Sequence, residues 1–95
     1  MSEEKYRVLI LDDNEELGQV LSEYLINTGR CIVTCVSSEA DFWSSLPRAS
    51  YDILFLDYRL QGTNGIEVLE RMGEAGYTIP TVMMTGEGSE NIAAR

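Results

Sequence analysis

Three aspartates and one threonine follow apolar, strand-like runs of this sequence and could share one reaction site. Asp12 and Asp13 follow the first run, Asp57 follows a later one, and Thr85 ends the last. Carboxylates held close together raise one another's pKa unless a cation compensates their charge. A hard divalent ion such as Mg²⁺ accepts carboxylate, backbone carbonyl and water oxygens. With a metal balancing the charge, Asp57 could act as a nucleophile, and Thr85 could donate a hydrogen bond to the new group.

The apolar runs predict strands that would place these side chains at one edge of a sheet. Residues 53–56 are all apolar, which is typical of a parallel strand covered by helices on both faces. Residues 7–11, 31–36 and 81–85 predict three further strands. Ligands of open parallel sheets bind beyond the carboxyl ends of the strands. If the first and third strands are neighbours, the three carboxylates lie in one pocket.

The segments between the strands predict helices. Residues 14–28 predict a helix whose start can be capped by Asp13 or Asn14. Five apolar residues would share one face of this helix: Leu17, Val20, Leu21, Tyr24 and Leu25. A short helix from Ser38 to about Leu46 would bury Ala40, Trp43 and Leu46. A third helix opens at Asn64 or Gly65 and has an apolar side formed by Ile66, Leu69 and Met72, with Val68 as a second apolar edge.

Alternation of strands and helices with short connections predicts an α/β fold, a doubly wound parallel sheet of right-handed βαβ units in one domain, residues 1–95. The formal net charge of −9 disfavours nucleic acid and anionic membrane as direct partners. No run is long enough to span a membrane and the start lacks the pattern of a signal peptide, so we expect a cytoplasmic protein. Cys31 and Cys35 on one strand would lie roughly 13 Å apart, too far for a disulfide.

In its motifs the sequence resembles the receiver domain of two-component response regulators. The similarity rests on Asp12 and Asp13 after the first strand, on Asp57 within residues 56–60, on Asn64 and Gly65, and on residues 84–86 after the fourth strand. The order, spacing and position of these motifs at strand ends are specific in combination. The resemblance implies a flavodoxin-like topology with strand order 2-1-3-4.

The resemblance also implies a role for each site residue. Asp57 would accept a phosphoryl group from a phosphohistidine on a sensor histidine kinase or phosphotransfer protein. Asp12, Asp13, Asp57 and the backbone carbonyl of Arg59 would hold Mg²⁺, with Mn²⁺ as an alternative, and Thr85 would be the switch hydroxyl. The domain would be a phosphorylation switch and not an enzyme beyond its own phosphorylation and dephosphorylation.

Two features depart from the family pattern. Gln61 stands where the family often has proline, which alters a loop without touching a reacting atom. Receivers also continue with a lysine that contacts the phosphoryl group, a fifth strand and a fifth helix, so we expect residues 1–95 to be an incomplete receiver, with an output domain beyond them. Its exposed fourth strand would then promote instability, self-association or completion by a partner.

Four alternatives are open to test. A flavodoxin-type cofactor module needs small residues and N–H groups around a phosphate, but residues 12–16 are acidic. A dinucleotide-binding module needs a glycine-rich first turn, which this sequence lacks. An aspartate-nucleophile phosphohydrolase has a second acid two residues after the nucleophile, where this sequence has Arg59. The strongest alternative is a pseudo-receiver that binds proteins without being phosphorylated.

Overall fold

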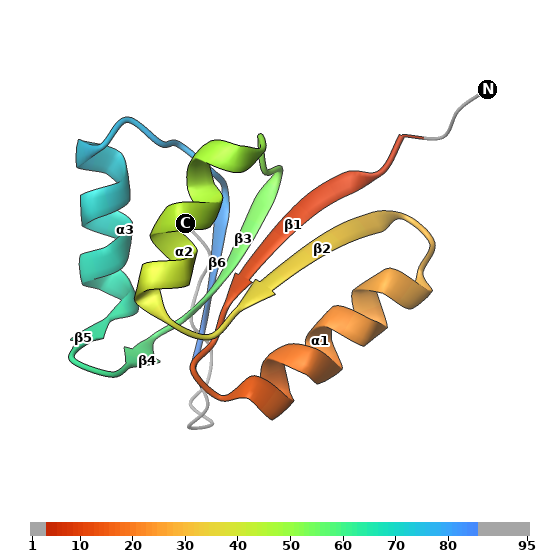
Figure 1. Ribbon diagram of the computed structural model, residues 1–95, viewed down its shortest axis with the longest axis horizontal. Coiled ribbons are helices and arrows are strands. Elements are labelled where there is room, and N and C mark those ends of the chain that lie inside the picture. The colour runs from red at the N-terminus through yellow and green to blue at the C-terminus, as the bar shows by residue number, and fades with distance from the viewer. Residues whose placement is uncertain (1–3, 86–95) are drawn as a thin grey trace.

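Strands and helices alternate through residues 4–85, the part of the chain that the computed structural model describes (Figure 1). The elements in order are β1 (Tyr6–Leu11), α1 (Glu15–Asn27), β2 (Cys31–Val36), α2 (Glu39–Ser45), the 3₁₀ turn η1 (Leu46–Arg48), β3 (Ile53–Asp57), β4 (Arg59–Leu60), β5 (Thr63–Asn64), α3 (Gly65–Glu74) and β6 (Thr81–Met84). Residues 86–95 lie outside the described part, and with them the last residue of the predicted motif at residues 84–86.

The four long strands form one parallel sheet in the order β2-β1-β3-β6. Because β6 is the fourth strand of this sheet, the predicted order 2-1-3-4 is confirmed. The short strands β4 and β5 form a separate antiparallel pair that the sequence did not predict. Figure 1 shows α1 on one face of the sheet and α2 and α3 on the other, so the sheet is doubly wound.

The main core lies between the sheet and the pair α2 and α3. Its buried side chains come from three strands, both helices and the turn η1: Leu9, Leu11, Phe42, Leu46, Leu54, Leu56, Val68, Met72 and Met83. Full burial of one such side chain stabilises the fold by roughly 1.5–3 kcal/mol. This core fixes β1 and β3 side by side, and with them the residues at their carboxyl ends.

Each helix begins at a polar cap directly after a strand or hairpin. Asn14 accepts a hydrogen bond from the Leu17 N–H (3.1 Å), and Ser38 accepts one from the Asp41 N–H (3.1 Å). Asn64 caps α3 in the same way. These caps satisfy N–H groups that have no partner within the helix, so each helix starts where the sequence predicted.

The predicted buried faces of the helices are partly wrong. On α1, Leu17, Val20 and Tyr24 are 53%, 64% and 70% exposed, and the residues that pack closely on the sheet are Gly18 and Ser22. Among residues 4–85, no element lies over the apolar stripe of α1. The periodicity identifies which side chains share a face, but it does not identify what covers that face.

Helices α2 and α3 also differ in detail from the prediction. In α2 the buried residues are Phe42 and Ser45, whereas Ala40 is exposed and Trp43 packs at the edge of the core. In α3 the predicted second edge, Val68, is fully buried, while Ile66 is 45% exposed. Each of these helices has apolar residues on two adjacent sides. Which side is buried depends on how the helix packs against the sheet.

Two other expectations concern the cysteines and membranes. Cys31 and Cys35 are both free, as their separation along one strand requires. Among the described helices, none is long and apolar enough to cross a bilayer.

Candidate functional site

The carboxyl edge of the sheet brings together the aspartates that the sequence singled out. Leu11 of β1 lies opposite Leu56 of β3 in a parallel register, so the residues that follow them, Asp12 and Asp57, reach the same edge. Asp57 in turn lies opposite Met84 of β6, which places Thr85 at this edge as well. The predicted neighbourhood of the first and third strands is therefore confirmed.

Three carboxylates form the centre of the site. One oxygen from each of Asp12, Asp13 and Asp57 lies within 4.8 Å of the other two. Asp12 is buried at 7% exposure, Asp57 is half-buried and Asp13 is exposed. Hard carboxylate oxygens converging from two strand ends suit a hard divalent cation such as Mg²⁺. The donor set therefore fits the predicted metal.

Backbone N–H groups orient two of these carboxylates. The Asn14 N–H donates to Asp12 Oδ1 (2.9 Å), and the Arg59 N–H donates to Asp57 Oδ1 (3.2 Å). Each bond joins an aspartate to the residue two positions further along the chain, as in an Asx turn. The carboxylates are thus held by the local backbone before any ligand binds.

The first turn of α3 closes tightly on the end of β3. The Gly65 N–H donates to the Tyr58 carbonyl (2.8 Å). A Cβ atom at Gly65 would lie 2.8 Å from the Asp57 carbonyl oxygen and 2.5 Å from Met83 Sδ. Only glycine fits this close approach, which explains its place directly after the Asn64 cap.

The electrostatics of the metal-free site act most strongly on Asp57. The pKa of Asp57 is raised from 3.8 to about 7, and burial is the largest cause. A hydrogen bond with the Asp12 carboxyl group and repulsion from Asp12 and Asp13 also raise this pKa, while the hydrogen bond from the Arg59 N–H lowers it. A cation among the carboxylates would remove the repulsion and favour the ionised, nucleophilic form of Asp57.

A cavity of about 490 Å³ opens over the three carboxylates. Thr85 and Arg59, the other two predicted site residues, both line it. Its remaining walls come from residues that the sequence did not assign to the site: Asn14, Leu17, Leu21 and Met84. Asn14 was predicted only as a cap, and the two leucines only as part of a buried helix face. The available signal was that the two leucines follow Asp13 by about one and about two helical turns, on the same face of the helix.

The comparisons with known proteins agree with this arrangement. The family model for the response regulator receiver domain matches residues 8–95. The chain therefore belongs to the response regulator receiver domain family.

Similar proteins include two longer relatives and solved structures of response regulators. The chain is 30% identical over 95 residues to the response regulator protein TodT of Pseudomonas putida, covering all of this chain and 41% of TodT. It is 30% identical over 89 residues to the protein RcaC of Microchaete diplosiphon, covering 94% of this chain and 13% of RcaC. The chain thus spans less than half the length of either relative.

Among solved structures, the response regulator protein TrrA of Thermotoga maritima, in complex with Mg(2+)-BeF, superposes with a TM-score of 0.76 at 20% identity. The match covers 87% of this chain and 71% of TrrA. The flavodoxin-like receiver fold predicted from the sequence is thereby confirmed.

Proposed function

We propose that this receiver domain is a phosphorylation switch in which Asp57 accepts a phosphoryl group from a phosphohistidine. The donor would be a sensor histidine kinase or a phosphotransfer protein. The observation that carries the proposal is the convergence of three carboxylates within 4.8 Å at the carboxyl edge of a parallel sheet. Membership of the receiver family gives this acidic cluster its most direct interpretation.

The donor set supports Mg²⁺ as the cofactor, with Mn²⁺ as an alternative. The carboxylate oxygens would come from Asp12, Asp13 and Asp57. Arg59 lines the same cavity and would supply its backbone carbonyl oxygen. When bound, the ion would neutralise the carboxylates and the negative charge of the incoming phosphoryl group. The complex of TrrA with Mg(2+)-BeF supports the same assignment.

The residues of the chain divide the remaining work. A carboxylate oxygen of Asp57 forms a bond to phosphorus as the phosphorus–nitrogen bond of the donor breaks, and the electron pair of that bond returns to the histidine. The Arg59 N–H holds Asp57 Oδ1 and so fixes the orientation of the carboxylate during attack. Thr85, on the wall of the cavity, would then donate its hydroxyl to a phosphoryl oxygen.

We also propose that the chain has no catalytic activity beyond its own phosphorylation and dephosphorylation, and that it acts in the cytoplasm. Its role would then depend on attached or partner proteins. The relatives TodT and RcaC extend well beyond the matched segment, which supports an output domain in the complete protein. The acidic surface of the site supports a protein partner rather than a nucleic acid at this edge.

The test is the intact mass of the protein after incubation with acetyl phosphate, with and without Mg²⁺. We expect a Mg²⁺-dependent gain of one phosphoryl group in the wild type and in a control variant, Asp41→Ala, which removes an exposed carboxylate on α2. Asp57→Ala should show no gain. A version extended beyond residue 95 should be tested in parallel, because a gain only in that form would place a required group outside this chain.

The pseudo-receiver is the second candidate, and the same experiment separates it from the switch. If neither length of the folded, Mg²⁺-binding protein gains a phosphoryl group, the acceptor chemistry with this donor is wrong. Turnover of phosphate monoesters would instead indicate a phosphohydrolase, and flavin absorbance of the purified protein would indicate a cofactor module.

A further inference from the structure

The edge of the sheet opposite the acidic site carries a cluster of cations. Lys5 lies directly before β1, Arg7 lies within it, Arg30 lies directly before β2, and Arg48 ends the turn that leads to β3. Because β1, β2 and β3 are parallel neighbours, their amino ends meet at one edge. Four of the seven basic residues of the chain therefore gather there. We call these four residues and Tyr6 the amino-edge surface.

All four cations are exposed, and no carboxylate within residues 4–85 forms an ion pair with any of them. Two described acids, Glu4 and Asp52, also lie at this edge, and a carboxylate oxygen of Asp52 already accepts the Arg7 N–H (2.7 Å). Exposed cations without ion-pair partners are available to an anionic partner.

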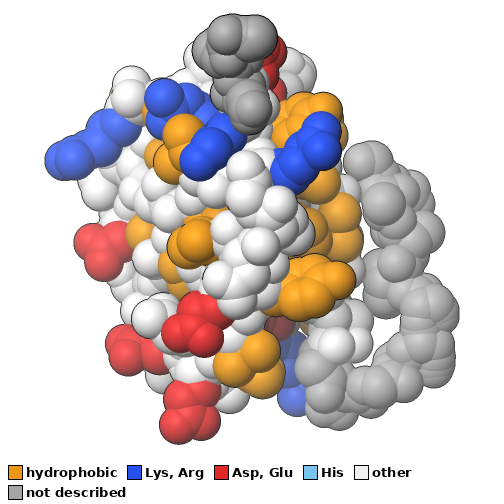
Figure 2. Space-filling view, turned by 90° about the vertical axis from the view of Figure 1, so that its right-hand side faces the viewer, with side chains coloured by type: hydrophobic (Ala, Val, Ile, Leu, Met, Phe, Trp, Pro, Cys, Tyr) orange, Lys and Arg blue, Asp and Glu red, His pale blue; other side chains and the backbone are white. Residues whose placement is uncertain are grey.

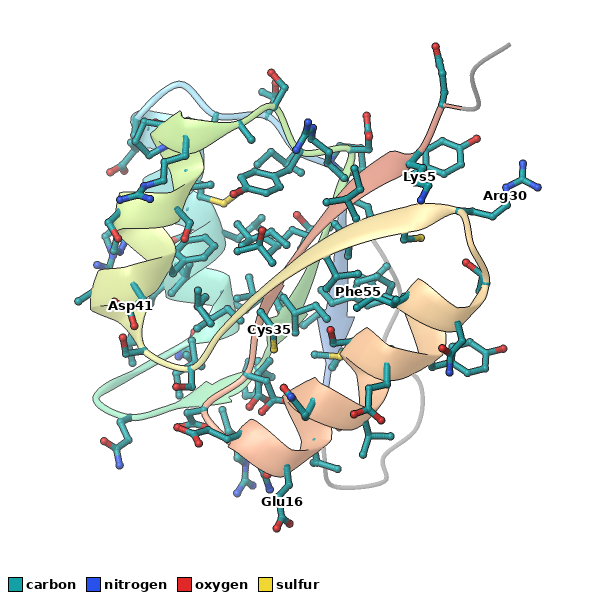
Figure 3. All side chains as sticks on the ribbon, turned by 45° about the vertical axis from the view of Figure 1, so that its right-hand side comes forward. Lys5, Glu16, Arg30, Cys35, Asp41 and Phe55 are labelled. Atoms are coloured by element: carbon teal, nitrogen blue, oxygen red, sulfur yellow. The ribbon has the colours of Figure 1, made fainter. Side chains whose placement is uncertain are left out.

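The charges of the molecule are segregated along the strand direction. In Figure 2 most of the visible Lys and Arg side chains gather at the upper end, and most Asp and Glu side chains lie lower. Figure 3 shows Lys5 and Arg30 close together at the upper right, with Glu16 at the opposite end of the molecule. In a chain of net charge −9, the amino edge is therefore where an acidic partner meets least repulsion.

The amino-edge surface also has an apolar contact point. Tyr6 is 57% exposed, and its backbone N–H donates to the Arg30 carbonyl (2.8 Å), which holds the two residues together. A hollow of about 410 Å³ is lined by Glu4, Tyr6, Gly29 and Arg30. An exposed aromatic ring beside Arg30 can pack against an alkyl or aromatic side chain of a partner while the cations contact carboxylates.

We propose that the amino-edge surface docks a short acidic segment of a partner protein. The three strands span about 10 Å, which is the length of about three extended residues. A nucleic acid would extend beyond this width and meet the acidic remainder of the chain, so the observations favour a peptide. The surface lies at the opposite edge from Asp57, so both can be occupied at once.

The test is a titration of the ¹⁵N-labelled chain at low salt with a capped peptide of six glutamates, followed by backbone amide shifts. We expect saturable shifts confined to residues 4–7, 29–31 and 47–49, which hold the four cations and Tyr6, and these shifts should be weakened by added salt. A peptide of six glutamines should cause none. Shifts centred on the acidic edge, or no shifts at all, would overturn the proposal.

Two matched variants assign the binding to the cations. The double change Lys5→Gln with Arg30→Gln should weaken binding by roughly fivefold, the usual effect of losing two exposed charges. The charge-keeping pair Lys5→Arg with Arg30→Lys should retain it. Equal binding by both would contradict the proposal, provided that circular dichroism shows both folded.

The proposal is independent of the phosphorylation switch, and two controls keep the two apart. Asp57→Ala should bind the peptide as the wild type does, whatever the outcome of the acetyl phosphate experiment. A single-stranded oligothymidylate that binds the same residues more tightly than the glutamate peptide would overturn the assignment to a protein partner.

Discussion

The raised pKa of Asp57 links folding of the metal-free protein to pH. In the folded state the pKa of Asp57 is about 7, whereas its ordinary value is 3.8. Between these two pH values the folded state retains a proton that the unfolded state has released. The protonated form contributes stability at low pH, and this contribution is lost as the pH rises through about 7. Above that pH the half-buried carboxylate is charged beside Asp12 and Asp13.

Replacement of Asp57 by asparagine should therefore stabilise the metal-free protein in a pH-dependent way. We expect the melting temperature of Asp57→Asn to exceed that of the wild type at about pH 8, where the wild-type carboxylate is charged. The difference should shrink at about pH 5, because protonated aspartate and asparagine are both neutral. Thermal melts in the presence of a chelator measure both differences.

Mg²⁺ supplies the control for this prediction. At about pH 8 the ion should raise the melting temperature of the wild type much more than that of Asp57→Asn, because binding to the folded state alone stabilises it. The control variant Glu70→Gln, an exposed acid on α3, should behave as the wild type does in both conditions. A stabilisation by Asp57→Asn that is the same at both pH values would contradict the electrostatic origin.

At the scale of single elements, α3 carries two glycines with opposite roles. A Cβ at Gly65 would clash with the Asp57 carbonyl oxygen and with Met83 Sδ, whereas a Cβ at Gly73 meets nothing within 4 Å. Gly65→Ala should destabilise the fold by roughly 1–3 kcal/mol through overpacking. Gly73→Ala should stabilise it by up to about 1 kcal/mol, because alanine favours the helix. Urea unfolding of both variants measures these effects.

The same two variants show whether the α3 junction positions the site. Gly65→Ala must displace the end of β3, so it should also weaken Mg²⁺ binding to the folded protein. Gly73→Ala should leave that affinity unchanged. If Gly65→Ala loses stability but binds Mg²⁺ normally, the junction supports the fold without setting the geometry of the carboxylates.

Sequence reasoning succeeded where the signal was local. Runs of apolar residues located the four strands of the sheet, and Asn14, Ser38 and Asn64 located the helix starts, because strand burial and capping depend on neighbouring residues. Placement of aspartates at strand ends was then enough to assemble Asp12, Asp13 and Asp57, since parallel neighbouring strands share an edge.

The predictions from the sequence failed where a structural feature depends on contacts between residues that are far apart in the sequence. The apolar stripe of α1 was correct in period, but its exposure depends on what lies over it. The strands β4 and β5 have two residues each, too few for a periodic pattern. The side-chain network that joins α2 to α3, in which Arg71 pairs with Glu39 and lies 5.9 Å from the Trp43 ring, needs the three-dimensional arrangement.

At the scale of the whole molecule, β6 is an edge strand of the sheet, and its outer side is unpaired within residues 4–85. Strand β6 pairs with β3 on one side, and no second strand among these residues pairs with its other side. The Pro80 carbonyl accepts a hydrogen bond from the Leu54 N–H of β3, and the Met84 carbonyl accepts one from the N–H of Tyr58, directly after β3. By the alternation of a strand, the N–H groups of Thr81 and Met83 point away from β3.

An open edge beside exposed apolar side chains favours association between copies of the chain. We expect the 95-residue chain to sediment as a species heavier than a monomer at tens of micromolar concentration. If β6 is the contact, hydrogen exchange at the Met83 amide should slow as the concentration rises, because its N–H gains an acceptor on the second copy. The amide of Glu23, an exposed residue within α1, serves as the control.

The exposed stripe of α1 offers a competing contact, and a variant separates the two. Val20→Gln with Tyr24→Gln removes the most exposed apolar side chains of that stripe without touching β6. If the copies associate through β6, this variant should still associate, and hydrogen exchange at the Met83 amide should still slow as the concentration rises. Association that disappears in the variant would transfer the contact to α1. A monomer at every concentration, with rapid exchange at Met83, would contradict association through either surface.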